Sequence, residues 1–406
     1  MPKITAIETT IPRDIMSNLV LVRIHTDAGI IGCGETYYTP HAIESLIHDW
    51  MAQRLIGAEA TDIESHWRFL YERCTAFGYP GAELRALSAI DVALWDILGQ
   101  VCGQPIWKLL GGATQKRVRI YNTCGGPGYG TLKQQKVTTH PGWPGYGDEG
   151  QPGPLQDNWS SIHAAGDLAE ELVAEGVTGM KVWPFDRYAH RTGGAYLSMA
   201  DIEAGMKPLR EIRDRVGDQI EIMVEGHAFF QLASALLLAR ALAEIRPFWL
   251  EDVLRVDNVE TLADFRLRSG LPIAATEMLL GRPAYLSLLQ ARAADYVMID
   301  PTWAGGISET RRIIEMAQAY NISATMHDCT GPITLFAGLH CAVASANVVL
   351  QETVRAHIRT FYERLIDRQP VIEQGWLLPP SDPGLGTAFL PELFEPGSKN
   401  PVRRTT

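Results

Sequence analysis

The sequence predicts a modified (β/α)8 barrel of the TIM type, joined to an α+β capping domain. In the second half of the chain, short apolar runs rich in β-branched residues recur, and each ends on an acidic residue or a histidine. These ends are Glu225, Glu251, Glu277, Asp300, His327 and Glu352. Successive ends are 26, 26, 23, 27 and 25 residues apart, which is the length of one strand, one helix and two short loops. Near-equal units of this kind are typical of a closed parallel barrel.

The composition describes a globular protein with enough apolar residues for a large core. The chain has 406 residues, 46% hydrophobic and 20% charged, and this length suits a barrel plus a smaller domain. A net charge of −11 argues against nucleic-acid binding. The start lacks a signal-peptide pattern, and no apolar run approaches the roughly 18 residues of a membrane span. The six cysteines show no CxxC pairing, which predicts free thiols in a reducing cytoplasm.

The capping domain is expected over residues 1–115. Alternating residues predict paired strands at 3–9 and 18–26, with a turn after them. The glycine-rich stretch that follows, IIGCGETYY, favours a third hairpin strand. The alternative, a phosphate-binding loop, lacks the necessary strand–loop–helix frame. Apolar spacing predicts helices over 41–55, 61–75 and 84–101.

The barrel is expected over residues 116–368. RVRIYNT (117–123) and GMKVWP (179–184) predict its first two strands, and the six runs described above complete the eight. Between these two strands lies a Gly/Pro/aromatic insertion, residues 125–159, which cannot form a regular helix. It is interpreted as a substrate-covering loop or, equally, as a mobile or oligomer-contacting one. Its aromatic residues include Tyr129, Trp143 and Tyr146.

The end of the chain does not continue the barrel pattern. After Glu352 a helix is expected to run to about Asp367. Turn signals then fill the tail, residues 369–406, which we expect to return to the capping domain.

Carboxylates at three adjacent strand ends predict a divalent metal site. The C-terminal ends of barrel strands meet at one site, so Glu225, Glu251 and Glu277 are expected to lie together. Hard oxygen ligands favour Mg²⁺, which keeps octahedral positions for water and substrate. One such glutamate alone would be read as a solvated strand end or a partner of a helix N-terminus. Three at the same register favour the metal.

His327 and Asp300 are the candidate general base and its partner. Asp328 follows His327 directly, but neighbours along a strand point to opposite faces, so Asp300 on the preceding strand is the better partner. A carboxylate bonded to an imidazole fixes its tautomer and raises its basicity. The alternative is a structural histidine at a strand end. His227, two positions after Glu225, is interpreted as a general acid, with metal ligand and loop residue as alternatives.

A metal facing a histidine base predicts abstraction of a proton α to a carboxylate. Three motifs add to this pattern, namely DAGIIGCGE (27–35), AIDVALWDILGQVCGQPIWKLLGG (89–112) and DPTWAGGISE (300–309). With them the chain resembles the enolase superfamily, in its mandelate racemase subgroup of acid-sugar enzymes, over nearly its whole length. The resemblance implies that Glu225, Glu251 and Glu277 are the metal ligands and that His327 and Asp300 form the His–Asp dyad. Glu352 matches the acidic residue of the eighth strand.

Two departures from the subgroup bear on the reaction. A Lys-x-Lys on the second strand is common there, but this chain has Lys181 and then Trp183, so racemisation with two bases is not expected. Lys181 is interpreted either as a ligand of the substrate carboxylate or metal-bound oxygen, or as an ion pair in the acidic shell. Glu225 replaces the more usual Asp. The Glu-Gly-His triplet is also similar to that of sugar-acid dehydratases, whose histidine protonates the leaving hydroxyl.

The sequence therefore predicts a Mg²⁺-dependent dehydratase, a hydro-lyase, that converts a sugar acid to a 2-keto-3-deoxy acid. The alternatives are a single-base epimerase or lactone cycloisomerase and, in a different class, a non-catalytic sugar-acid-binding relative. The resemblance implies a homo-oligomer, possibly an octamer as in many relatives. Substrate stereochemistry is expected to be read by the insertion and by capping loops around 13–17 and 76–83.

Overall fold

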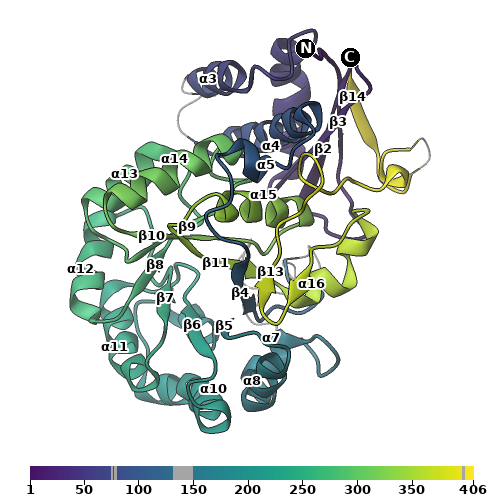
Figure 1. Ribbon diagram of the computed structural model, residues 1–406. Coiled ribbons are helices and arrows are strands. Elements are labelled where there is room, and N and C mark those ends of the chain that lie inside the picture. Colours follow the sequence, from purple (N-terminus) through teal and green to yellow (C-terminus); the bar gives the residue numbers. More distant parts are fainter. Residues whose placement is uncertain (75, 77–79, 131–149, 396–397) are drawn as a thin grey trace.

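The computed structural model describes residues 1–406 except 75, 77–79, 131–149 and 396–397. Eight parallel strands form a closed barrel beside a capping domain, as the sequence predicts (Figure 1). Each barrel strand pairs with the next, and the last pairs with the first. The strands are β4 (Val118–Thr123), β5 (Gly179–Val182), β6 (Glu221–Glu225), β7 (Trp249–Glu251), β8 (Ile273–Ala275), β9 (Tyr296–Ile299), β10 (Ser323–Met326) and β11 (Val348–Thr353).

A layer of large side chains fills the barrel interior. Its fully or nearly fully buried members are Tyr121, Met223, Trp249, Ala274, Met298 and Leu350. Successive side chains of a strand point to opposite faces, so the residue two positions later faces inward again, one layer higher. That rule places Glu225, Glu251, Asp300 and Glu352 above this layer, at the C-terminal end of the barrel. Glu225 and Glu251 are direct partners in the β6–β7 register.

Helices cover the outside of the barrel and bury its second apolar face. The longer ones are α8 (Ala165–Ala174), α10 (Met199–Val216), α11 (Leu232–Leu242), α12 (Val259–Ser269), α13 (Arg282–Gln290), α14 (Gly306–Ala319) and α15 (Pro332–Val343). Shorter helices are α5 (Ile106–Leu109), α7 (Asp157–His163), α9 (Asp186–Ala189) and α16 (Arg355–Thr360). Within the described residues, every helix is too short or too polar to span a bilayer.

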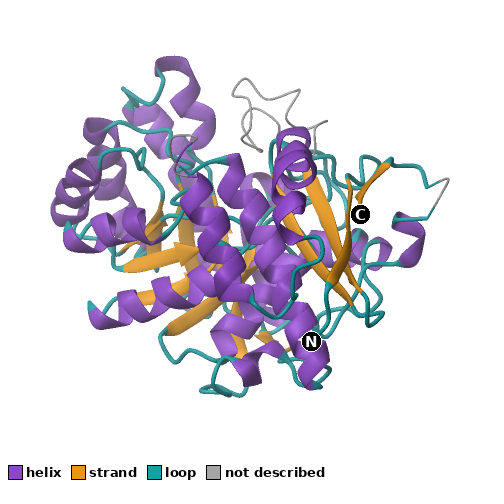
Figure 2. Cartoon of the chain, turned by 90° about the horizontal axis from the view of Figure 1, so that it is seen from above, coloured by secondary structure: helices purple, strands orange, loops and turns teal. Residues whose placement is uncertain are grey.

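The capping domain is a four-stranded antiparallel sheet in the order β14-β1-β2-β3, with helices packed on it. Its elements are β1 (Ile4–Thr10), β2 (Leu19–Thr26), β3 (Ile31–Tyr37), α1 (Pro40–Leu46), α2 (Ala52–Leu55), α3 (Ile63–Cys74) and α4 (Ala82–Cys102). The predicted 41–55 helix contains a π-helical turn at Ile47–Met51. Figure 2 shows this sheet at one side of the molecule, with helices between it and the barrel strands.

The glycine-rich stretch is the hairpin strand β3 and not a phosphate loop. Its glycines have a packing reason, because a Cβ on Gly32 or Gly34 would lie 2.1 or 2.0 Å from a backbone carbonyl oxygen of α4. Helix α4 can therefore lie directly on the sheet. On its other side, Asp91 of α4 accepts hydrogen bonds from the backbone N–H and hydroxyl of Ser308 at 3.0 and 2.6 Å. These bonds attach the capping domain to helix α14 of the barrel.

The tail contacts both parts of the molecule. Strand β14 (Val402–Thr405) pairs with β1 in the capping sheet. Before it, the β12 (Ile372–Glu373) and β13 (Trp376–Leu377) hairpin pairs with β4 of the barrel. The helix expected up to Asp367 is shorter than predicted: α16 ends at Thr360, and a 3-10 turn (Tyr362–Arg364) follows. Phe361, at φ −131°, leaves the helical region because its buried ring turns into the core.

Candidate active site

A small, partly open cavity of about 20 Å³ lies over the C-terminal ends of the barrel strands. The barrel contributes Lys181, Glu225, His227, Glu277, His327 and Glu352 to its lining, together with Cys329 and Trp303. Tyr37 and Tyr38 from the capping domain and Tyr129 and Gly130 from the insertion close it. Six of the eight candidate site residues thus face one cavity, and Glu251 and Asp300 are fully buried directly beside it. Trp143 and Tyr146 of the insertion lie outside the described residues.

Lys181 lies among three of the strand-end carboxylates. Its ammonium is 3.2 Å from Glu225 and 2.9 Å from Glu352, and it also donates a hydrogen bond to Glu251. The structure therefore places Lys181 in the ion-pair arrangement, one of the two interpretations of the sequence. Glu251 accepts a further hydrogen bond from the indole N–H of Trp249 at 2.8 Å.

The pKa values of the neighbouring carboxylates Glu225 and Glu251 shift in opposite directions. Burial acts against ionisation of Glu225, but the charges of His227 and Lys181 outweigh it and lower the pKa of Glu225 to about 2. Burial raises the pKa of Glu251 well above its usual value, and the charge of Glu225 adds to this effect. Like charges in one buried site cannot all ionise without a cation to balance them. One ammonium is insufficient for this group of carboxylates.

The three predicted metal ligands supply the right donor atoms. Glu225, Glu251 and Glu277 are at most 4% exposed, and the Oε2 atom of Glu277 is buried with no hydrogen-bond partner. A buried, unsatisfied carboxylate oxygen is costly unless a cation binds it. Hard carboxylate oxygens fit Mg²⁺. Lys181 lies between Glu225 and Glu251. In the described part of the chain, no three acidic, histidine or cysteine side chains lie close enough together to hold a metal ion.

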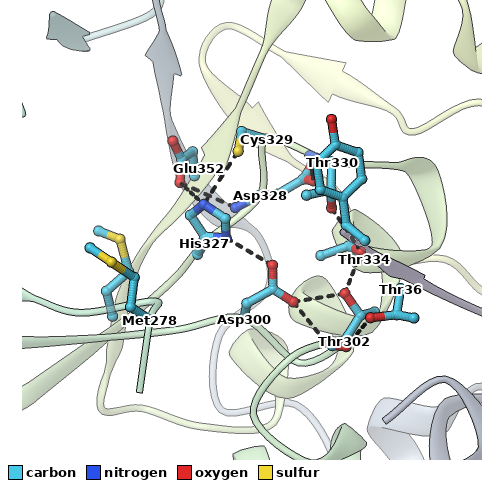
Figure 3. A network of polar contacts seen from close by, with 12 residues as sticks. Thr36, Met278, Asp300, Thr302, His327, Asp328, Cys329, Thr330, Thr334 and Glu352 are labelled. Atoms are coloured by element: carbon cyan, nitrogen blue, oxygen red, sulfur yellow. Dashed lines mark hydrogen bonds and ion pairs between the residues drawn. The ribbon is translucent and has the colours of Figure 1, made fainter. Parts of the chain in front are cut away.

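His327 pairs with Asp300 and not with its sequence neighbour (Figure 3). Its Nδ1 is 2.8 Å from Asp300 Oδ2, and the other oxygen of Asp300 accepts bonds from the backbone N–H and hydroxyl of Thr302 at 2.7 and 2.8 Å. Asp328 accepts instead from the Thr330 backbone N–H and the Tyr362 hydroxyl. Asp300 is thereby fixed, and it fixes the imidazole in turn.

The free side of the His327 ring faces the cavity. Its Nε2 is 3.4 Å from Cys329 Sγ and 3.8 Å from Glu352 Oε2. Burial opposes protonation, but Cys329, Glu352 and the hydrogen bond with Asp300 together raise the pKa of His327 well above its usual value. Burial raises the pKa of the Cys329 thiol to about 11, so Cys329 is neutral near pH 7. Glu352 also accepts a hydrogen bond from the Thr123 hydroxyl.

A second His–Asp pair, which the sequence reasoning missed, holds His227. Its Nδ1 is 2.5 Å from Asp186 Oδ2, and both residues are at least 96% buried. Glu225 Oε1 accepts the backbone N–H groups of Gly226 and His227 at 3.0 and 2.8 Å, which stabilises the turn with His227 at φ 44°. Burial acts to lower the pKa of His227, but Asp186 and Glu225 outweigh it and raise that pKa.

Aromatic residues complete the walls. Trp183, at the position of the missing second lysine, is buried 5.5 Å from the His227 ring and 5.2 Å from Tyr129. Its ring packs behind the lining residues His227 and Tyr129 and carries no base. Trp303 lies 4.9 Å from the His327 ring and 5.7 Å from Tyr38.

Comparison with known proteins settles the family. Residues 164–393 match the family model described as "Enolase C-terminal domain-like", and residues 2–111 match that of "Mandelate racemase / muconate lactonizing enzyme, N-terminal domain". The chain belongs to this family of the enolase superfamily. The resemblance read from the sequence is thus confirmed, as is the expectation that the protein is an enzyme, a hydro-lyase.

Relatives of this enolase-superfamily chain include a D-galactonate dehydratase of Ralstonia nicotianae, 29% identical over 95% of this chain and 94% of the relative. A D-galactonate dehydratase family member of Pseudarthrobacter chlorophenolicus is 28% identical over 92% and 90%. Among solved structures, an enolase protein from the Sargasso Sea environmental genome is 36% identical with a TM-score of 0.86, over 100% of this chain and 99% of that one. An Agrobacterium tumefaciens enolase of the mandelate racemase subgroup is 35% identical, with a TM-score of 0.84 over 99% and 98%.

Proposed function

We propose that the protein is a Mg²⁺-dependent dehydratase of an aldonic or related sugar acid, giving a 2-keto-3-deoxy acid. The observation that carries the proposal is the pair of buried His–Asp dyads, His327–Asp300 and His227–Asp186, which present two imidazoles to one cavity. Dehydration needs a base for the C2 proton and an acid for the 3-hydroxyl, and two separate imidazoles meet that need. The relatives named as D-galactonate dehydratases support the same class of substrate.

Glu225, Glu251 and Glu277 would hold the metal, since their oxygens match its preference and Glu277 Oε2 lacks another partner. When bound, Mg²⁺ stabilises negative charge that develops on the substrate carboxylate after loss of the C2 proton. Lys181 alone leaves part of the charge of these carboxylates uncompensated, which a bound cation would balance. Lys181 is 3.2 Å or less from the carboxylates of this group, where its ammonium would attract a substrate carboxylate as well.

The proton transfers follow from the two dyads. In its neutral form, His327, oriented through Nδ1 by Asp300, takes the proton from C2 at Nε2. His227, held through Nδ1 by Asp186, gives a proton to the 3-hydroxyl, which leaves as water. The resulting enol takes up a proton at C3 and becomes the 2-keto-3-deoxy acid. Glu352, 3.8 Å from the Nε2 atom, lies where it can accept a hydrogen bond from the enediol.

The test is a screen of the purified protein with Mg²⁺ against aldonates and aldarates in D2O. A 2-keto-acid assay and proton NMR are read together, and a 2-keto-3-deoxy product is the expected result. Deuterium at C2 without keto product would replace the dehydratase by the epimerase or cycloisomerase. His327→Asn should abolish C2 exchange while the fold and metal binding persist, and continued exchange in that variant would overturn the base assignment. The homo-oligomeric state and the cytoplasmic location stay predictions.

A further inference from the structure

We propose that Arg85 and Trp303 form a subsite for a second anionic group at the far end of the substrate, so that the enzyme favours sugar acids with such a group over simple aldonates. The anionic group is the terminal carboxylate of an aldarate or the phosphate of a phosphorylated aldonate. The inference rests on the proposed function, because it extends the same cavity.

Arg85 is a cation without an acidic partner beside the cavity. It belongs to α4 of the capping domain, and its guanidinium carbon lies 3.9 Å from the centre of the Trp303 ring and 5.5 Å from that of Tyr38. Among the described residues, its one hydrogen bond goes to the backbone carbonyl of Tyr37, at 3.2 Å. Both tyrosines and Trp303 line the cavity. No carboxylate of the described residues lies within ion-pairing distance of the guanidinium. Burial lowers the pKa of Arg85 to about 10, so it stays charged at neutral pH.

Arg355 shows what this protein does with a buried arginine that has only a structural part. Its guanidinium forms two bonds with Asp157, at 2.7 and 2.8 Å, and further ion pairs with Glu171 and Glu175, both at 2.9 Å. Every face of that guanidinium is matched by negative charge. Arg85 is half-buried and lacks such a match among the described residues, which leaves most of its five N–H donors available.

Trp303 supplies the second observation. It is 2% exposed, lines the cavity, and its indole N–H is buried without a hydrogen-bond partner. A buried, unsatisfied donor costs free energy, and a ligand oxygen in the cavity would satisfy it. The ring lies between the two functional groups, since one neighbour is the His327 imidazole at 4.9 Å and the other is Arg85. Trp303 therefore separates the subsite from the reacting imidazole.

The cations of the site are divided between two regions. Lys181 is committed to Glu225, Glu251 and Glu352, at the end of the cavity where the proposed metal and the reacting carboxylate belong. Arg85 belongs to α4 of the capping domain and lies behind the lining residues Trp303 and Tyr38. In the proposal, the far end of a six-carbon chain held by that carboxylate reaches it. A neutral terminal hydroxyl leaves the guanidinium unpaired, whereas a carboxylate or phosphate accepts two of its N–H groups at once. Such a site discriminates strongly against the ligand that lacks the anion.

The experiment compares matched sets of a hexonate, its hexarate and its 6-phosphate, all of one stereochemistry, with the Mg²⁺-loaded enzyme. We expect kcat/KM for the hexarate or the 6-phosphate to exceed that for the hexonate at least tenfold, and the ratio of these two kcat/KM values is compared between variants. In Arg85→Gln that ratio should fall at least tenfold, mainly through KM, and Arg85→Lys should restore part of it. Trp303→Phe keeps an aromatic ring but removes the indole N–H, and it should reduce the ratio less than Arg85→Gln does. The hexarate and the 6-phosphate tell which anion the subsite takes.

The matched control is Arg117→Gln. Arg117 stacks on Trp376 at 4.2 Å, and Trp376 pairs with Arg119 near the start of β4, at the opposite end of the barrel. The ratio of the two kcat/KM values in Arg117→Gln should equal that of the unchanged enzyme. The subsite is refuted, while the dehydratase stands, if kcat/KM for the hexonate equals that for the hexarate and the 6-phosphate. It is also refuted if Arg85→Gln leaves the ratio of the kcat/KM values unchanged.

If no compound yields a keto product, the proposed function fails and binding decides the subsite. Calorimetric titration of the Mg²⁺-loaded protein with the same hexonate, hexarate and 6-phosphate then gives their dissociation constants. The subsite is supported if the hexarate or the 6-phosphate binds more tightly than the hexonate and if Arg85→Gln abolishes this difference. Equal binding of all three compounds refutes it.

Discussion

Replacement of Lys181 by methionine tests how the acidic centre is balanced. The ammonium is 3% exposed and lies 2.9 Å from Glu352 and 3.2 Å from Glu225. At an effective dielectric constant of about 20, each such contact is worth roughly 5 kcal/mol before desolvation of the charges is subtracted. Removing one partner of a buried ion pair costs about 3–5 kcal/mol, because the remaining charge is left uncompensated. Methionine fills nearly the same volume, so the loss is electrostatic.

Urea unfolding followed by circular dichroism measures that loss. In EDTA the variant should be destabilised by about 3–5 kcal/mol, seen as a lower midpoint at an unchanged slope. Excess Mg²⁺ should recover much of it, since a ligand at 100 times its dissociation constant adds about 2.7 kcal/mol to the folded state. Lys116→Met, on the exposed surface, is the control and should change little. A loss below about 1 kcal/mol in EDTA would refute the balancing role of Lys181.

Three further outcomes follow. Glu277→Gln should weaken Mg²⁺ binding and lower turnover together, and a variant that binds Mg²⁺ normally in calorimetry would remove Glu277 from the ligands. Asp186→Asn should lower kcat about 10²–10⁴-fold by freeing the His227 ring, while C2 exchange catalysed at the other dyad survives; loss of exchange as well would contradict separate roles. His340 accepts a hydrogen bond from the Trp107 backbone N–H at 3.2 Å, and burial lowers the pKa of His340 to about 4. As the pH falls, the unfolded chain therefore binds a proton at this histidine before the folded chain does. The free energy of unfolding should fall by at most about 3 kcal/mol between pH 6.5 and 4. His340→Gln should flatten that fall in unfolding measured across the same pH range, and an unchanged slope would contradict the assignment.

The barrel and most of the site were predictable because they repeat. Four strands of the second half end on an acidic residue two positions after an interior one, as Met223 precedes Glu225 and Leu350 precedes Glu352, whereas Glu277 is three positions after Ala274. A period of two fixes which side chains face inward, and the unit length fixes that their ends meet. The same rule chose Asp300 over Asp328 as the partner of His327, and the structure pairs them at 2.8 Å.

Contacts made by loops could not be predicted from the sequence, because loop residues follow no periodic pattern. Asp186 begins a one-turn helix four residues after β5 ends, and only the folded chain brings it 2.5 Å from His227, 41 residues away. An acidic residue just past a strand end was the available signal. Arg85 and Trp303 come from different parts of the molecule, and each reads alone as an ordinary helix or loop residue. The early end of α16 at Thr360 reflects tertiary packing of Phe361, which overrides local helix propensity.

The positions of the two dyads bear on the stereochemistry of the reaction. His227 follows β6 and His327 follows β10, and these strands are four apart in a closed ring of eight, so they lie on opposite sides of the barrel mouth. Both imidazoles line the same cavity. A substrate between them presents its C2 proton to one histidine and its 3-hydroxyl to the other from opposite faces. The geometry therefore favours anti elimination, and only sugar acids whose C2 hydrogen and C3 hydroxyl can lie anti while the carboxylate stays beside the strand-end glutamates should be dehydrated. Either C3 epimer can bring its hydroxyl anti by rotation about the C2–C3 bond, but the remainder of the chain then points in a different direction. Faster turnover of one C3 epimer than of the other, under otherwise identical conditions, is therefore the expected result.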